Sequence, residues 1–148
     1  RSKDEQTEWG DLIGTYLASG RPKHLFLLVD IRHEPSPEDR QMFQWTLHAG
    51  VPFTVVATKA DKISKSQRVI AANNAAKLLG APAFAIPFSA EEKIGKEALT
   101  ERIGQIYADA DDQARRAQEA ALLFAEAELA FAQAGDQPDA DETDETDE

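Results

Sequence analysis

The sequence contains no cysteine, which excludes both a disulfide framework and a thiolate metal site. Its histidines, His24, His33 and His48, are scattered along the chain, and no spacing among them would build a zinc site. We therefore expect no metal site in these residues. No apolar run reaches the roughly 18 residues of a membrane span, and the first residues lack the features of a signal peptide. A cytoplasmic protein without a membrane partner is expected.

Several catalytic patterns are also missing. No nucleophile elbow with a Ser/His/Asp set occurs. There is no G-x-x-x-x-G-K-[ST], so the loop that cradles nucleotide phosphates is absent from these residues, and no D-x-x-G follows a strand. Asp30 and Arg32 follow an apolar run, but we interpret them as an ion pair that organises a loop. No catalytic residue is assigned.

The charge is strongly acidic and unevenly distributed. The formal net charge is -11, and eight of the acidic residues lie from Asp136 onward without any basic residue. The rest of the chain is therefore only weakly acidic. Residues 135–148 are almost devoid of apolar side chains, which predicts a disordered acidic tail.

The remaining pattern alternates helices and strands within a length expected for one domain, 148 residues. Helices are predicted at residues 9–19, 37–48, 66–79 and 94–108. Strands are predicted at 24–30, 51–57 and 83–87. The strands are short and nearly continuous in apolar residues, as in a parallel sheet covered by helices on both faces. Right-handed crossovers place the three strands side by side, so the fold class is α/β.

The most informative segment is VPFTVVATKADKIS, in which an apolar strand ends in Thr58-Lys59-Ala60-Asp61. Ligands of open parallel sheets bind at the carboxyl ends of the strands. A carboxylate there can accept hydrogen bonds from the N1–H and the exocyclic amine of guanine, whereas adenine would leave it unpaired at considerable cost. The methylene stem of Lys59 can cover the face of the base.

A simpler interpretation of this segment remains open. T-K-x-D is a short motif that recurs by chance, and Asp61 or Ser64 can equally cap the helix that follows. Basic residues cluster around the loop and can contact phosphate or RNA, or simply begin a solvated helix: Lys59, Lys62, Lys65 and Arg68.

The segments WGDLIGTYL, LLVDIRHEPSPEDRQM, GVPFTVVATKADKIS and PFSAEEKIG together resemble the EngB/YsxC (YihA) family of bacterial GTP-binding proteins. This family belongs to the TrmE-Era-EngA-EngB-like P-loop GTPases, and the resemblance covers residues 9–106. It implies the three-layer P-loop NTPase (G-domain) fold with a mostly parallel sheet. The guanine-binding residues that it implies are Thr58, Lys59, Ala60, Asp61, Phe88, Ser89 and Ala90. The Ala90 N–H would face the guanine carbonyl oxygen.

The family places its phosphate loop and switch motifs before the segment that begins at Trp9. The resemblance therefore implies the carboxyl-terminal half of such a GTPase, whether as a truncated chain or as a split gene product. Residues 1–111 would form part of the G domain, with about three strands, followed by an Ala-rich accessory helix at 112–134 and the tail at 135–148. GTP or GDP is the expected ligand. Mg²⁺ belongs to the complete family protein, with ligands outside this chain, and the chain alone is expected not to hydrolyse GTP.

The implied role is assembly of the large ribosomal subunit and normal division septation, with the subunit or its rRNA as partner and no DNA. The alternative is a non-catalytic remnant or interaction module that acts through the Ala-rich helix and the acidic tail. That helix carries an apolar stripe, which either packs on its own domain or binds a partner: Ala120, Leu123, Phe124, Ala127 and Phe131.

The resemblance also implies that strand 24–30 lacks the neighbour it has in the family. An apolar strand at an open edge is prone to self-association. We expect the chain alone to be molten, or to self-associate through this edge, unless the 112–134 helix covers it.

Overall fold

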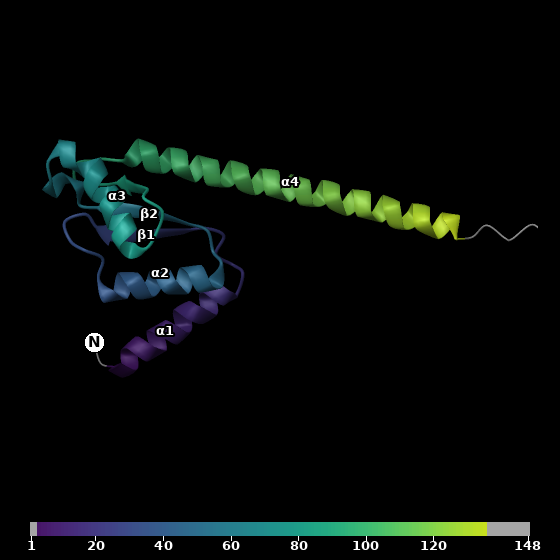
Figure 1. Ribbon diagram of the computed structural model, residues 1–148, viewed down its shortest axis with the longest axis horizontal. Coiled ribbons are helices and arrows are strands. Elements are labelled where there is room, and N and C mark those ends of the chain that lie inside the picture. Colours follow the sequence, from purple (N-terminus) through teal and green to yellow (C-terminus); the bar gives the residue numbers. More distant parts are fainter. Residues whose placement is uncertain (1–2, 136–148) are drawn as a thin grey trace, which may run out of the picture. The chain divides into compact units, whose positions relative to one another are not determined.

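A computed structural model describes residues 3–135, and the chain divides into two compact units, 1–104 and 105–148. The predicted acidic tail lies outside the described residues from position 136 onward. The elements follow in the order α1 (Lys3–Ala18), β1 (Leu25–Asp30), α2 (Pro37–Ala49), β2 (Phe53–Thr58), α3 (Arg68–Leu79), β3 (Ala85–Pro87) and α4 (Lys96–Ala134) (Figure 1). Two short 3-10 turns, Ala60–Lys62 and Lys65–Gln67, lie between β2 and α3.

The three strands form one parallel sheet in the order β1-β2-β3, which confirms the predicted α/β fold. β1 and β2 run in register from Leu25 opposite Phe53 to Asp30 opposite Thr58. β3 joins the other edge of β2, with Pro87 opposite Ala57. The carboxyl ends of all three strands therefore lie at one edge of the sheet, where each continues into a polar loop.

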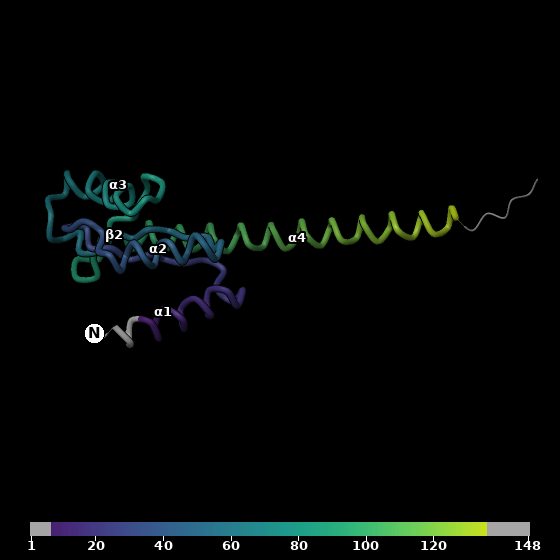
Figure 2. The backbone as a smooth tube through the Cα atoms, turned by 60° about the horizontal axis from the view of Figure 1, so that its bottom comes forward, coloured from purple at the N-terminus to yellow at the C-terminus, as the bar shows by residue number. Residues whose placement is uncertain are grey.

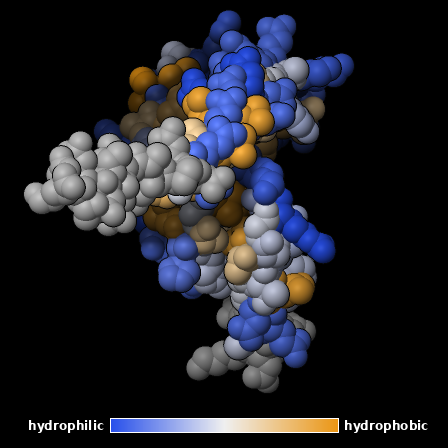
Figure 3. Space-filling model, turned by 90° about the vertical axis from the view of Figure 1, so that its right-hand side faces the viewer, coloured by the Kyte–Doolittle hydropathy of each residue, from blue (hydrophilic) through white to orange (hydrophobic). Residues whose placement is uncertain are grey.

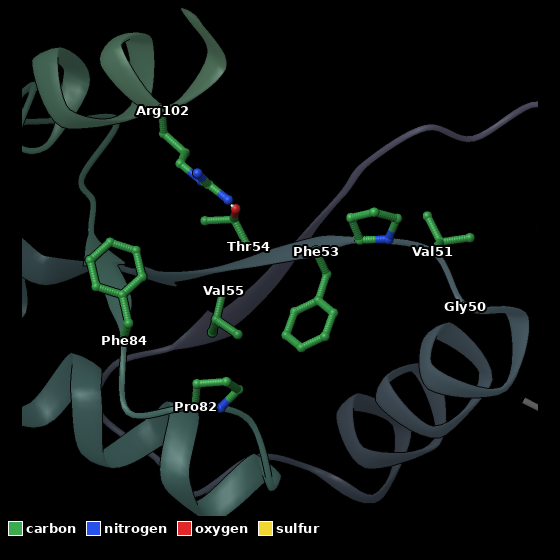
Figure 4. A pocket seen from close by; sticks show the side chains of 9 residues that line it. Gly50, Val51, Phe53, Thr54, Val55, Pro82, Phe84 and Arg102 are labelled. Carbon is green, nitrogen blue, oxygen red and sulfur yellow. Dashed lines mark hydrogen bonds between the residues drawn. The ribbon is translucent and has the colours of Figure 1, made fainter. Parts of the chain in front are cut away.

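The main core lies between the sheet and the pair α2 and α3, which also contact each other (Figure 2). Small side chains on α3 let this helix approach the strands closely: Ala72, Ala75 and Ala76 are each at most 4% exposed. On the opposite face of β2, the first turns of α4 around Arg102 lie across from the helices near Gly50 and Pro82 (Figure 4). This second face of the sheet is covered only in part, because the side chain of Leu28 on β1 stays exposed.

Local sequence signals set the ends of α2. Ser36 accepts a hydrogen bond from the Asp39 N–H at 3.1 Å, and the Asp39 carboxylate accepts one from the Ser36 N–H at 2.9 Å, forming a capping box. Pro37 occupies the first turn, and Gly50 ends the helix in the left-handed conformation with φ 67°. These features agree with the predicted helix 37–48.

Three helix predictions need correction. α1 begins at Lys3 instead of residue 9. Among its large apolar side chains, Leu17 is buried, whereas Trp9 and Tyr16 are about half exposed. α3 begins at Arg68, after a 3-10 turn. The helices predicted at 94–108 and 112–134 form the single helix α4, because no proline or glycine lies between 105 and 134 and aspartate alone does not end a helix. The expected boundary at residue 112 thus falls inside a continuous helix.

Within the described residues, β1 pairs with β2 alone, and its Leu28 side chain is 63% exposed. Other apolar patches interrupt the polar surface (Figure 3). Self-association through the β1 edge stays a prediction.

None of the helices between residues 3 and 135 is long and apolar enough to span a membrane.

Gly95 fixes the loop that follows β3. Its φ is +78°, and a Cβ atom there would collide with the carbonyl oxygen of Pro87. The loop closes through the Ser89 N–H, which donates to the Ile94 carbonyl at 3.0 Å. Only glycine accommodates both the backbone angle and the close approach, so this residue holds the Ser89 loop against the end of β3.

We expect Gly95→Ala to lower the free energy of unfolding by more than about 1–2 kcal/mol, the cost of a left-handed conformation for a residue with a Cβ atom. Gly104→Ala is the matched control, because nothing lies within 4 Å of a Cβ at that helical position. It should stabilise the protein by about 0.5–1 kcal/mol. Chemical denaturation of the three proteins measures both effects, and equal stability of the two variants would contradict the role of Gly95.

Candidate functional site

The loops that follow β2 and β3 are joined at the carboxyl edge of the sheet. The Phe88 N–H donates to the Ala57 carbonyl at 2.8 Å, and the Ala60 N–H donates to the Phe88 carbonyl at 3.0 Å. These backbone bonds extend the β2–β3 contact beyond the strands. The structure therefore brings together the two predicted site segments, Thr58-Lys59-Ala60-Asp61 and Phe88-Ser89-Ala90, although 26 residues separate Asp61 from Phe88 in the sequence.

Asp61 is the fixed acidic group of this site. The Ser89 hydroxyl, only 1% exposed, donates to Asp61 Oδ1 at 2.7 Å. The same hydroxyl accepts from the Glu92 N–H at 3.2 Å, which fixes its orientation. Lys62 Nζ lies 3.4 Å from Asp61 Oδ2. The hydrogen bond from Ser89 is the largest cause that lowers the pKa of Asp61, and the contacts with Lys62 lower it further, so the carboxylate is ionised.

The capping interpretation of this loop does not hold for either candidate residue. Ser64 precedes the 3-10 turn Lys65–Gln67, but its side chain makes no capping hydrogen bond there. The Asp61 carboxylate bonds to Ser89 on the neighbouring loop. Ser89 is 28 positions away from Asp61 in the sequence. Their hydrogen bond is therefore a tertiary contact between two loops and does not cap a helix end.

Lys59 is held by a second carboxylate, which the sequence analysis did not connect with it. Its backbone is left-handed with φ 59°, and its Nζ lies 3.3 Å from Asp30 Oδ2. Asp30 also accepts from Arg32 Nε at 3.0 Å and Nη2 at 2.8 Å, which confirms the predicted ion pair. Arg32 chiefly, with Lys59, holds the pKa of Asp30 far below its ordinary value. The Lys59 side chain stays 56% exposed.

A buried support lies behind the loop. Ala60 is fully buried, and its carbonyl accepts from Arg68 Nε at 2.8 Å. Arg68 Nη2 also approaches Glu92 Oε2 at 4.0 Å. Of the four basic residues considered as phosphate or RNA contacts, Arg68 is thus engaged in holding the loop. Thr58 serves a similar purpose, because its hydroxyl donates to the Val29 carbonyl at 3.1 Å and ties the loop to β1.

Ala90 is exposed and follows directly on the buried Ser89. Among the described residues, no hydrogen-bond acceptor meets the Ala90 N–H. Phe88 is half buried, and its N–H and carbonyl form the backbone bonds to Ala57 and Ala60. The site thus presents an ionised carboxylate, the stem of a lysine and a backbone donor.

Among residues 3–135, no three His, Asp or Glu side chains group closely enough to hold a metal ion. Two cavities of the first unit lie away from this site. One, of about 580 Å³, surrounds the amino end of β2, where Thr54 points toward Arg102 (Figure 4). The other, of about 600 Å³, lies between α1 and α2 and includes Trp9 and Trp45. The Asp61 site lies at the opposite end of β2, where the Asp61 side chain is 7% exposed.

Ser89→Ala should raise the pKa of Asp61, because it removes the largest cause of the lowered value. Since folding lowers this pKa, the hydrogen bond stabilises the protein above the ordinary carboxyl pKa, and this contribution disappears as the pH falls through the folded value. The stability difference between the two proteins should therefore shrink in acid. Carboxyl-carbon NMR titration measures the pKa directly. Ser64→Ala, at an exposed serine of the same loop, should leave it unchanged, and an unshifted Asp61 in Ser89→Ala would contradict the assignment.

Comparison with known proteins places this arrangement in a family. No family model matches the chain. The chain is 42% identical over 112 residues to "Probable GTP-binding protein EngB" of Alkaliphilus metalliredigens, covering 73% of this chain and 53% of the relative. It is 40% identical over 107 residues to the protein of the same description from Lachnoclostridium phytofermentans, covering 70% and 53%.

The fold is similar to a crystal structure of a probable GTP-binding protein engB, with a TM-score of 0.62 and 23% identity over 74% of this chain and 70% of that one. This likeness supports the arrangement of strands and helices. The chain spans about half the length of the curated relatives that it matches. On the sequence relationship and the shared fold, the chain belongs to the EngB family of GTP-binding proteins.

Proposed function

We propose that this chain recognises the guanine base of GTP or GDP through Asp61. The observation that supports this most strongly is the hydrogen bond from the buried Ser89 hydroxyl to Asp61 Oδ1. It fixes an ionised carboxylate at the carboxyl edge of the sheet before any ligand arrives. A group that is already oriented loses little conformational freedom when it binds.

The specificity follows from the donors and acceptors of the bases. The guanine N1–H and exocyclic amine can donate to the two oxygens of Asp61, and Oδ1 retains a lone pair for this purpose beside its bond from Ser89. Adenine presents an acceptor and no amine at this edge, which leaves the carboxylate unpaired. In this proposal the exposed stem of Lys59 covers one face of the base, and the Ala90 N–H donates to the guanine carbonyl oxygen.

The complete protein is proposed to be a cytoplasmic GTPase that acts in assembly of the large ribosomal subunit and in normal septation. Its phosphate-binding groups and Mg²⁺ ligands would lie in a segment outside this chain. The support for this role is the family resemblance across residues 9–106. We further propose that residues 1–111 act as the guanine-recognising part of the G domain, with 112–134 as an accessory segment.

Asp61→Asn should weaken GTP binding by about 1–3 kcal/mol, the cost of unpairing a buried polar group. The variant belongs in a protein that joins this chain to the phosphate-binding segment of the family. Xanthine nucleotides should be relatively favoured, because the carbonyl that replaces the guanine amine accepts from the new amide. Titration with GTP and XTP gives the ratio of the two dissociation constants.

Glu91→Gln is the matched control. Glu91 belongs to the neighbouring loop and its side chain is 77% exposed. Its Oε2 lies 3.6 Å from Lys62 Nζ, the same ammonium group that contacts Asp61. The substitution removes the same charge without touching the proposed base contact, so the preference for guanine should survive. An unchanged GTP-to-XTP ratio in Asp61→Asn would contradict the proposed function.

A further inference from the structure

The second unit consists, among its described residues, of the distal part of α4, which carries an unusually apolar surface. Phe124 is 68% exposed, Phe131 is 84% exposed and Leu123 is 66% exposed. Soluble helices normally bury such a face against another element. Within residues 3–135, no helix is long and apolar enough to cross a membrane.

The large and small apolar residues of this segment alternate with heptad spacing. Steps of three and four residues connect one stripe through the helix: Ala117, Ala120, Phe124, Ala127, Phe131 and Ala134. This is the a/d repeat by which two helices supercoil and insert side chains into each other's gaps. The phenylalanines occupy one of the two repeating positions, and only alanines occupy the other.

This alternation makes the stripe complementary to itself in one direction only. In an antiparallel pair, position a of one helix faces position d of the other. Phe124 then faces Ala127 of a second copy, Phe131 faces Ala120, and Ala117 faces Ala134. Each large side chain meets a small one, as a well-packed core requires. A parallel pair would stack phenylalanine on phenylalanine and alanine on alanine, producing alternately wide and narrow layers.

The charges of the segment favour the same direction. Arg115 and Arg116 are its basic residues, and both lie near its amino end. In the antiparallel register they lie beside the carboxyl end of the second helix, where the exposed carbonyl groups carry partial negative charge. The sequence beyond that end contains eight acidic residues and no basic one. A parallel pair would bring the arginines of both copies together.

We propose that the distal part of α4 is a dimerisation surface that pairs with the same segment of a second copy, antiparallel, through residues 117–134. The area is sufficient. An aromatic side chain can bury about 150–250 Å², so the four phenylalanines of the pair supply on the order of half of the roughly 1,200 Å² at which stable interfaces begin. The alanines and Leu123 add to it. Leu122 and Leu129 lie outside this stripe and do not contribute to the pair.

The first test compares the oligomeric state of two matched variants of the complete chain. Ala127→Glu places a carboxylate opposite Phe124 of the partner, whereas Ala125→Glu adds the same side chain two residues earlier, on the outer side of the helix. In sedimentation velocity at micromolar concentration, the parent and Ala125→Glu should be dimers and Ala127→Glu a monomer. A monomeric parent, or a dimer in all three, would overturn the proposal; the latter would indicate another surface such as the β1 edge.

The second test establishes direction. Because the chain has no cysteine, Ala117→Cys and Ala134→Cys each introduce a single thiol. These positions are about 25 Å apart along one helix, at 1.5 Å per residue, yet face each other in the antiparallel pair. An oxidised mixture of the two variants should cross-link one to the other, whereas each variant alone should not. Cross-linking of each variant with itself, or none in the mixture, would overturn the antiparallel arrangement.

Discussion

The hydrogen bond from Ser89 to Asp61 is the contact on which the candidate site depends. It joins two loops that follow different strands, and both its partners are largely withdrawn from water. The bond exists because β2 and β3 are neighbours in a parallel sheet, so that their carboxyl ends open at the same edge. Gly95 holds the loop of Ser89 close to β3, and Arg68 holds the loop of Asp61 from behind. The position of the Ser89–Asp61 hydrogen bond thus depends on the strand order, on the backbone of Gly95 and on the contact from Arg68.

Two carboxylates lie at this edge, and their surroundings give them different roles. Asp30 accepts from Arg32 through both oxygens and also contacts Lys59. Its hydrogen-bonding capacity is used to fix the loop and to position the lysine. Asp61 accepts one hydrogen bond from Ser89 and lies near the half-exposed Lys62. It therefore keeps acceptor capacity for a ligand, which is the property that base recognition needs.

The sequence was sufficient to predict those parts of the fold that depend on local signals. The apolar runs indicated the three strands, and Ser36, Pro37 and Gly50 marked the ends of α2. The proximity of the Thr58 and Phe88 segments also followed, because neighbouring parallel strands deliver their loops to one edge. The family resemblance, more than the short motif itself, selected Asp61 among the acidic residues.

Other features depend on contacts that no local pattern reveals. The pairing of Asp30 with Lys59 follows from the register that sets Asp30 opposite Thr58, and register is a property of the folded sheet. The need for glycine at position 95 arises from its approach to Pro87. Trp9 and Tyr16 on α1 are exposed, and helical periodicity alone does not indicate which residues another element covers.

The central claim is that Asp61, oriented by Ser89, binds the guanine edge. A crystal structure with GDP, of a protein that joins this chain to the phosphate-binding segment of its family, tests it most directly. We expect the two oxygens of Asp61 to accept from N1–H and the exocyclic amine, while the bond from Ser89 to Oδ1 persists. A guanine bound away from Asp61, or an Asp61 turned from Ser89 to reach it, would contradict the account.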